Sequence, residues 1–234
     1  MLKKNYLRYN TKSALGDIFL RRYLFLAIFV FGTWIAILAQ KEDSFIITNY
    51  ENGMFETEAY IEPEASLEIM RGIVLDIDTL FRRIEIDSLE WAIKGLSGKE
   101  EGKNFLRIDL KDAEYDPKTN LFDFFIDIYV SIIKRQFNVR VTVLMKTGSD
   151  QNGNPFMAVE VYNPNFFLKK TSGTFSILQT ESKKQFVVKT SVSFGWFFNL
   201  FISTSNYNSV AEWRIQTFLE NIKTEAESRQ KLRY

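Results

Sequence analysis

The side chains in this chain that could do chemistry are mainly carboxylates. The sequence has no cysteine and no histidine, which excludes thiol nucleophiles, disulfides, imidazole acids or bases and nearly every zinc site. Paired carboxylates could act as a general acid and a general base, or could hold a cation. Three groups lie close together in the sequence: Asp76 and Asp78; Asp109, Asp112, Glu114 and Asp116; and Asp123 and Asp127.

The surroundings of these carboxylates favour solvated positions over a reactive site. The group from Asp109 to Asp116 runs from a predicted strand into a turn and lacks the glycine and the ligand spacing of a calcium loop. Asp123 and Asp127 share one face of a predicted strand, and we expect that face to meet water. If it lined a cavity instead, both carboxylates would be buried and functional. We therefore predict no catalytic residue, no metal site and no cofactor.

The first 39 residues differ from the rest of the chain in hydropathy and charge. Residues 23–39 form an apolar run of 17 residues without charge. A spanning helix needs roughly 20 apolar residues and the core of a signal peptide about 7 to 15, so the run fits either an uncleaved anchor or a cleaved signal. Ala39 is a small residue at a cleavage edge, but Ile37 is larger than such a site favours. The basic residues that precede the run are Lys3, Lys4, Arg8, Lys12, Arg21 and Arg22.

This charge distribution predicts an orientation in a membrane. By the positive-inside rule, residues 1–22 stay in the cytoplasm and the body crosses to the periplasmic or extracellular side. Both interpretations of the run share this orientation, and both predict a membrane contact through residues 23–39. A buried helix of a soluble protein is the alternative, which the all-round apolarity of the run and its asymmetric flanks disfavour.

The remaining residues have the composition of one globular domain. They carry 24 basic against 28 acidic residues, which gives little attraction for a phosphate backbone, so we predict no nucleic-acid partner. The chain is 46% hydrophobic and has 22 phenylalanines, enough for a substantial core. We divide it into a basic segment 1–22, a signal or anchor 23–39, a connecting segment 40–54 and a globular domain 55–230.

Hydrophobic periodicity predicts the order of elements in this domain. Residues 45–62 read as an extended segment or hairpin whose better strand is 55–61. Pro63 suits the first position of a helix that continues to residue 77, and a second helical piece follows over 79–96. Alternation with period two then predicts strands from residue 105 and over 122–132, 139–145, 156–162, 173–180 and 186–198.

A long amphipathic helix is predicted at the C-terminal end. Ala211, Ile215, Phe218, Ile222 and Ala226 recur at spacings of three and four residues, with charged residues between them. The last residues, 225–234, are strongly charged, and we expect them to fray. The short turns between the strands predict an antiparallel sheet.

This order of elements resembles the START-like, or SRPBCC, helix-grip superfamily. The resemblance covers residues 55–230. Two local features add to it: Gly173-Thr174-Phe175 is similar to the family's glycine-led penultimate strand, and Trp196-Phe197-Phe198-Asn199 leads into the last helix. The resemblance implies an α+β fold in which a curved antiparallel sheet wraps around the C-terminal helix and leaves a cavity for an apolar ligand. The family has no universal catalytic signature, so no residue role is carried over.

The implied cavity predicts a protein that sequesters or carries a lipid or another apolar small molecule. The rival hypothesis is a structural or protein-interaction domain of the cell envelope whose core is solid and whose partner is unknown. A cyclase-like or hydrolytic enzyme that uses Asp, Glu, Tyr or Arg is a third possibility. The candidate ligand-binding residues are inward positions of the strands and apolar positions of the last helix, namely Phe124, Ile126, Val141, Val143, Val159, Phe194, Trp196, Trp213 and Phe218.

The run from Phe194 to Ile202 holds seven large apolar residues in nine. A single-layer sheet cannot readily bury both faces of such a strand, so part of the run could form a lipid-touching edge or a gate of the cavity. The alternative, which we favour, is a strand-to-helix corner packed between the sheet and the helix.

Overall fold

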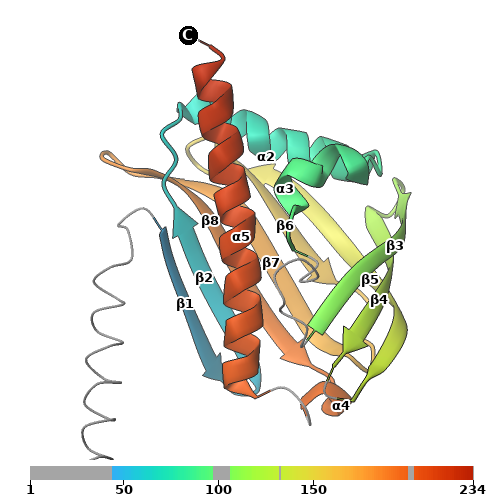
Figure 1. Ribbon diagram of the computed structural model, residues 1–234. Helices are drawn as coiled ribbons and strands as arrows, with labels where there is room; N and C mark the ends of the chain where they lie inside the picture. Colours follow the sequence, from blue (N-terminus) through green and yellow to red (C-terminus); the bar gives the residue numbers. More distant parts are fainter. Residues whose placement is uncertain (1–43, 97–105, 132, 200–202, 234) are drawn as a thin grey trace, which may run out of the picture. The chain divides into compact units, whose positions relative to one another are not determined.

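The computed structural model describes residues 44–96, 106–131, 133–199 and 203–233 (Figure 1). The chain divides into a unit of residues 1–42 and a compact unit of residues 43–234, which contains every described element. The apolar run 23–39 lies outside the described residues. Among the helices that are described, none is long and apolar enough to cross a membrane.

Eight antiparallel strands form one sheet. In sequence they are β1 (Ser44–Glu51), β2 (Met54–Ile61), β3 (Leu106–Asp116), β4 (Leu121–Val130), β5 (Arg135–Ser149), β6 (Pro155–Val161), β7 (Leu168–Gln179) and β8 (Lys184–Phe194). Their spatial order is β1-β2-β8-β7-β6-β5-β4-β3, so the N-terminal hairpin pairs with the last strand. Short turns connect all consecutive strands except β2 and β3, which are separated by helices.

Helices lie at both ends of the strands and along the concave side of the sheet. The segment between β2 and β3 holds α2 (Leu67–Arg82), a 3-10 turn η1 (Ile86–Leu89) and α3 (Glu90–Ile93). After β8 come α4 (Trp196–Asn199) and α5 (Thr204–Lys231). Figure 1 shows α5 running along the strands, with α2 and α3 at one end and α4 at the other.

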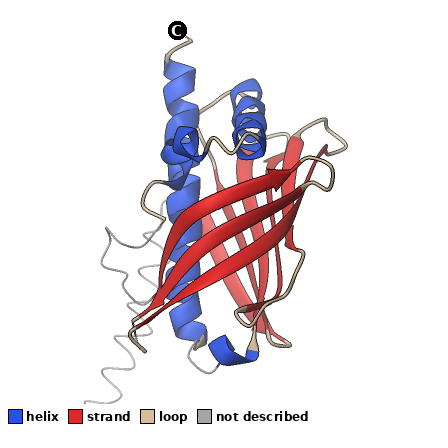
Figure 2. Ribbon diagram, turned by 90° about the vertical axis from the view of Figure 1, so that its right-hand side faces the viewer, coloured by secondary structure: helices blue, strands red, loops and turns tan. Residues whose placement is uncertain are grey.

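The sheet curls around α5. Strands β3, β4 and β5 cross over in front of the other strands when the molecule is turned by 90° (Figure 2). Two bulges interrupt the strand pairing. One lies between β3 and β4 at Lys111, and the other between β7 and β8 near Lys169. Bulges increase the local twist of a sheet. The helix-grip arrangement predicted from the START-like resemblance is confirmed by this architecture.

The inward side chains form two core clusters rather than one. The larger cluster joins α2, α3 and the C-terminal half of α5 to the sheet, with Met70, Phe186 and Ile222 fully buried. The smaller cluster lies on β4, β5 and the loop before β7, and it includes Val130, Val141 and Phe167. Both clusters belong to residues 43–234, so this unit has the hydrophobic core that it needs to fold by itself.

Several element boundaries differ from the sequence-based expectation. The hairpin expected within residues 45–62 is present, but its first strand, β1, occupies residues 44–51, most of the segment that we assigned to a connection, and each of these residues pairs in register with β2. Pro63 does not begin the helix. Instead α2 begins at Leu67, where the Ser66 hydroxyl caps the helix by accepting from Ile69 N at 3.4 Å.

The charged end of α5 does not fray. The helix continues to Lys231 because polar contacts tie it to α2 and the preceding loop. Arg229 pairs with Asp76 and, at 2.7 Å, with Glu225, and Gln230 Oε1 accepts from Ser66 N at 2.8 Å. The expectation of fraying was wrong because it considered the charges without the partners that α2 supplies.

Strand β8 ends at Phe194, four residues earlier than predicted. Gly195 follows, and its N–H donates to Phe167 O at 2.7 Å. A Cβ at Gly195 would lie 2.1 Å from Phe166 O, so only glycine allows the loop before β7 to approach this closely. Trp196 to Asn199 then form α4 instead of the end of the strand.

We predict that Gly195→Ala lowers the free energy of unfolding by about 1–3 kcal/mol or more, because the added methyl group must push the Phe166 carbonyl away. Urea denaturation followed by circular dichroism measures the change. Gly72→Ala on α2 is the control, since nothing lies within 4 Å of a Cβ there, and we expect it to stabilise the protein by about 0.5–1 kcal/mol. Equal stability of Gly195→Ala and the unmodified protein would contradict the proposed close approach.

Candidate functional site

A cavity of about 380 Å³ lies between the sheet and the N-terminal half of α5. Two hollows of similar volume lie on the outer face of the sheet, where the ion pair of Glu58 and Lys189 lines both. Small-molecule sites are usually concave and mostly apolar, and the inner cavity has that character. Its apolar walls come from Ile108 of β3, Val159 of β6, Leu168 of β7, Val192 and Phe194 of β8, and Val210, Ala211 and Ile215 of α5.

The cavity lies where the two core clusters meet. Leu168 and Phe194 pack against the smaller cluster, and Ile215 packs against the larger one. Aromatic contacts fix α5 on the side of its N-terminus, since Tyr207 stacks on Phe55 at 3.9 Å and meets Phe194 edge-on at 5.7 Å. The helix is therefore held on both sides of the cavity, and its residues Val210, Ala211 and Ile215 line the open space.

Gly173 keeps the floor of the cavity open. In the antiparallel register it stands between Val159 on β6 and Thr190 on β8. A Cβ at Gly173 would lie 3.4 Å from Val159 Cγ2 and 3.8 Å from Thr190 Cγ2, which is ordinary contact. A larger side chain would extend into the cavity. Glycine weakens the interior of a strand, and here the missing side chain leaves space beneath α5.

A row of threonines crosses the sheet beside this glycine. Thr48, Thr57 and Thr190 stand opposite one another on β1, β2 and β8, and the hydroxyls of the first two lie 3.0 Å apart. The Tyr207 hydroxyl reaches this row. Burial raises the pKa of Tyr207, and the Thr57 and Thr190 hydroxyls oppose that rise. Tyr207 is therefore a neutral phenol at neutral pH.

Arg214 contributes the only cation among the described residues of the cavity wall. Burial lowers the pKa of Arg214 to about 10, which leaves the guanidinium charged at neutral pH. Its Nε donates to Leu96 O at 3.1 Å. The described hydrogen bond of Arg214 thus ties α5 to the segment after α3.

The structure brings two of the nine predicted ligand-binding residues to the cavity, Val159 and Phe194. Phe124, Ile126, Val141 and Val143 belong to the core clusters or pack against them. Phe218 meets Phe175 edge-on at 5.3 Å in the larger cluster. Trp213 is half-buried on α5, and Trp196 is 73% exposed on α4. Contact of Val159 and Phe194 with a ligand stays a prediction.

The sequence analysis missed the polar lining and the N-terminal part of the helix wall. Tyr207, Val210, Ala211, Arg214 and Ile215 recur at helical spacing, so the amphipathic pattern could have been extended back from Ala211. Thr171 and Thr190 gave no signal, because threonine is common in strands and nothing local marks a hydroxyl that faces inward. The aromatic run contributes Phe194 to the cavity and exposes Trp196, and residues 200–202 lie outside the described part.

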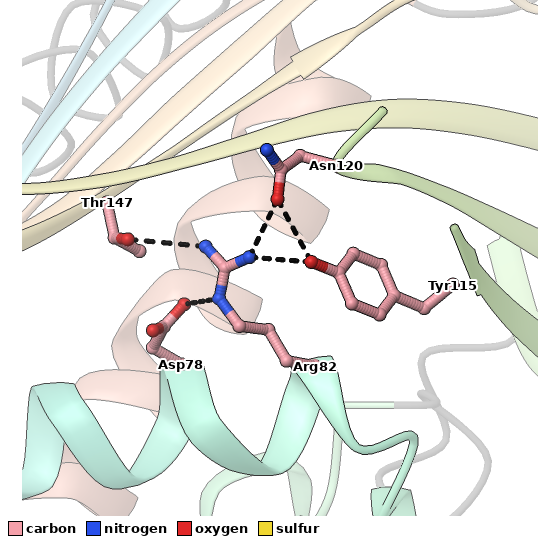
Figure 3. Close-up of polar contacts among 5 residues, drawn as sticks. All are labelled: Asp78, Arg82, Tyr115, Asn120 and Thr147. Carbon is pink, nitrogen blue, oxygen red and sulfur yellow. Dashed lines mark hydrogen bonds and ion pairs between the residues drawn. The ribbon is translucent and has the colours of Figure 1, made fainter. Parts of the chain in front are cut away.

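The carboxylates of α2 hold the fold together. Asp78 Oδ1 accepts from Arg82 Nε at 2.9 Å, and the same guanidinium donates to Tyr115, Asn120 and Thr147 at 2.8–3.2 Å (Figure 3). These contacts join α2 to β3, β5 and the β3–β4 turn. Asp76 instead pairs with Arg229 on α5. Asp76 and Asp78 thus bind different arginines and do not form an acid–base pair.

The expectation that Asp127 meets water was wrong, since Asp127 is only 7% exposed. It lies on the outer face of β4, whereas its neighbours in the strand, Ile126 and Ile128, lie on the inner face. Asp127 does not line the cavity. Neighbouring strands cover it: Gln136 donates at 2.7 Å, Asn138 also donates, and Lys111 pairs with it at 3.2 Å. The cross-strand partners satisfy this carboxylate, which sequence periodicity cannot show.

The carboxylates of the β3–β4 region have local roles. Asp109 pairs with Arg107 at 3.0 Å, Asp112 accepts from Ala113 N, and Asp116 accepts from Lys118 N and the Thr119 hydroxyl in the turn. Glu114 is exposed. Within the described residues, no group of three or more acidic side chains is placed to hold a metal ion.

Asp123 also has partners on the outer face of the sheet. Arg140 Nε and Nη2 donate to its two carboxylate oxygens at 2.9 and 2.5 Å, and Thr142 Oγ1 donates at 2.5 Å. The Arg140 hydrogen bonds hold the pKa of Asp123 below its usual range, with the Thr142 hydroxyl adding to the effect.

Comparison with known proteins places the likeness at the level of fold. No family model and no curated protein sequence matches the chain. A START superfamily protein from Mycobacterium smegmatis is 10% identical, with 74% of this chain and 97% of that protein covered and a TM-score of 0.39. A fragment of the STAR-related lipid transfer protein from Xanthomonas axonopodis is also 10% identical. The alignment covers 79% of this chain and 96% of that fragment, with a TM-score of 0.40.

A third similar structure is the di-domain ARO/CYC StfQ from the steffimycin biosynthetic pathway, at 12% identity and a TM-score of 0.44. The alignment covers 75% of this chain but only 51% of StfQ, which is longer. The di-domain ARO/CYC BexL is likewise covered over 60% of its length. These identities and TM-scores concern the course of the chain and carry no information about a ligand or a reaction.

We predict that Asp123→Asn lowers the urea midpoint of unfolding at pH 7 and has a smaller effect at pH 3. Because the folded-state pKa of Asp123 is lowered, its ion pair stabilises the fold above the ordinary aspartate pKa of about 3.9 and is lost as the pH falls through the lowered value. Glu181→Gln, in the exposed β7–β8 turn, is the control and should alter neither midpoint. An effect of Asp123→Asn that is the same at both pH values would rule out this ion pair as the cause.

Proposed function

We propose that residues 43–234 bind an apolar small molecule in the cavity between the sheet and α5. The observation that supports this most directly is the apolar cavity itself, which is left open by Gly173 and bounded by residues of both core clusters. Its volume of about 380 Å³ lies at the lower end of the usual range of roughly 300–1,000 Å³ for ligand sites. A compact ligand suits it better than a lipid with two acyl chains.

Burial of apolar surface would supply most of the affinity. Each Å² of ligand surface removed from water contributes about 25 cal/mol, so a ligand that buries about 200 Å² gains roughly 5 kcal/mol before the costs of association. The walls formed by Val159, Phe194, Val210 and Ile215 offer such contacts. A small number of polar groups on the same walls would select among ligands.

The titratable groups of the cavity favour binding over acid–base catalysis. The described lining residues include no carboxylate, and their titratable members are Tyr207 and Arg214. The raised pKa of Tyr207 keeps the phenol protonated at neutral pH, and Arg214 keeps its charge. Neither side chain is therefore poised as a general base near pH 7. This supports a binding protein as the first hypothesis and an enzyme as the second.

We predict that Gly173→Val abolishes binding without destabilising the fold. The valine side chain would project into the cavity from its floor, while a β-branched residue suits the interior of a strand better than glycine. Native mass spectrometry of residues 43–234, purified without detergent and incubated with fatty acids and other compact apolar molecules extracted from cells, measures bound ligand. Urea unfolding measures stability.

Thr174→Val is the matched control, because Thr174 is the next residue of β7 and lies on the outer face. We expect it to leave the bound fraction unchanged. A persistent absence of any adduct on the unmodified protein, or equal adducts on Gly173→Val, would count against the cavity as a ligand site.

We further propose that the apolar run 23–39 delivers this domain across a membrane and leaves it on the periplasmic or extracellular side. The sequence supports this through six basic residues before the run and its length of 17 uncharged residues. In a bacterial host, protease added to spheroplasts should digest the body of the full chain and spare that of a chain lacking residues 1–39. The mass of the recovered protein distinguishes an anchor from a cleaved signal. Protection of the full chain would refute the proposed orientation.

A further inference from the structure

Two hydroxyl groups in the cavity wall have no hydrogen-bond partner among the described residues. Thr171 Oγ1 and Thr190 Oγ1 are both buried, and both residues line the cavity. Two other buried side-chain atoms of the described chain lack a hydrogen bond, Asn208 Oδ1 and Arg107 Nε, of which the second is in an ion pair with Asp109, and neither residue lines the cavity. The unpartnered hydroxyls therefore coincide with the candidate ligand site.

The sheet register places these hydroxyls close together. Thr171 on β7 stands opposite Val192, and Thr190 on β8 stands opposite Gly173. Thr171 and Thr190 are thus diagonal neighbours on the same face of adjacent strands, a relation in which the Cα atoms lie about 7–8 Å apart, so that a ligand group placed between the two side chains can approach both. Because Gly173 has no side chain, nothing from that position stands between the hydroxyls and the cavity.

The neighbouring polar groups do not satisfy these two hydroxyls. The Tyr207 hydroxyl is close enough to the Thr190 hydroxyl to lower the tyrosine pKa as a hydrogen bond does, but the contact falls outside the distance and angles of a hydrogen bond, so Thr190 Oγ1 is still able to bond a ligand atom. Arg214 Nε donates to Leu96 O. A buried hydroxyl without a partner lowers stability, and most such groups in folded proteins are paired. A ligand oxygen at this place would supply the missing partner.

We propose that the ligand is an apolar molecule that carries a hydrogen-bonding oxygen, such as a hydroxyl or carbonyl group, and that Thr171 and Thr190 bind this oxygen. The inference rests on the proposed function, because it requires a ligand in the cavity. It adds that the site discriminates against hydrocarbons of the same shape. Each hydroxyl can donate or accept, so both can bond one ligand oxygen.

The test compares two probes of nearly equal shape, 2-naphthol and 2-methylnaphthalene, by fluorescence titration of residues 43–234 at pH 7. The proteins are the unmodified unit, Thr171→Val, Thr190→Val and the double variant, with Thr174→Val on the outer face as control. Valine keeps the shape of threonine and removes the hydroxyl. The quantity measured is the ratio of the Kd of 2-methylnaphthalene to the Kd of 2-naphthol.

We expect this ratio to fall about tenfold from the unmodified unit to the double variant, with an intermediate value for each single variant, since each hydrogen bond contributes severalfold to affinity. Thr174→Val should leave the ratio unchanged. We also expect both single variants to unfold at higher urea concentration than the unmodified unit, because an unpartnered buried hydroxyl is replaced by a methyl group.

The outcomes separate this inference from the proposed function. If both probes bind with a ratio that the valine variants do not change, the cavity binds apolar molecules but the threonines do not select an oxygen, and the inference is overturned alone. If neither probe binds, the inference and the proposed function both fail. Loss of stability in both single variants would mean that the hydroxyls are partnered inside the folded chain, which also overturns the inference.

Discussion

The attachment of α5 to the concave face of the sheet at two separate places determines the rest of the domain. On the C-terminal side, Leu219, Ile222 and Ala226 are fully buried in the larger core cluster, and Arg229 adds an ion pair with Asp76 on α2. On the N-terminal side, the Tyr207 ring stacks on Phe55. A helix is stiff between such contacts, so it bridges the stretch of the sheet around Gly173, where one strand position offers no side chain. The cavity is the space that this bridge leaves, and it exists because neither end of the helix can move inward without losing buried apolar contacts.

The polar residues of the domain divide into those that stabilise the fold and those that line the cavity. The carboxylates that first suggested chemistry are bound by other side chains: Asp78 by Arg82, Asp123 by Arg140, and Asp127 by Lys111 and two amides (Figure 3 shows the first). All these contacts lie outside the cavity, on the outer face of the sheet or at the end covered by α2. The cavity walls hold neutral hydroxyls and one guanidinium instead. This separation lets the sheet keep a charged, solvated exterior while its interior remains suited to an apolar molecule.

Several positions around the cavity lower the stability of the domain, which is the pattern expected at a functional site. Gly173 weakens the middle of a central strand, Thr171 and Thr190 bury hydroxyls without hydrogen bonds, and Arg214 is placed where burial opposes its charge. None of these four residues improves the packing of the interior. Elsewhere, several glycines have local structural reasons, such as the close approach of the Phe166 carbonyl at Gly195, whereas Gly72 on α2 has none. The concentration of unfavourable positions at one place supports a role for the cavity beyond that of a packing defect.

The sequence by itself determined the kind and order of the elements, because alternation with period two and recurrence at three and four residues are local consequences of which face is buried. It thereby predicted the antiparallel sheet, the helices before β3 and the apolar face of α5 at Ile222 and Ala226. The curvature of the sheet was implied only by the resemblance to the helix-grip superfamily. Only the tertiary structure decided that β2 pairs with β8, that Asp127 is covered by neighbouring strands, and that Val159 and Phe194 reach the cavity while Phe124 and Val141 fill the core. The physical reason is that the face on which a side chain lies follows from its position in its own strand, which the local sequence shows. Whether an inward side chain meets another side chain or an open space depends on residues far away in the sequence, here on Gly173 and on the two contacts that hold α5 above it.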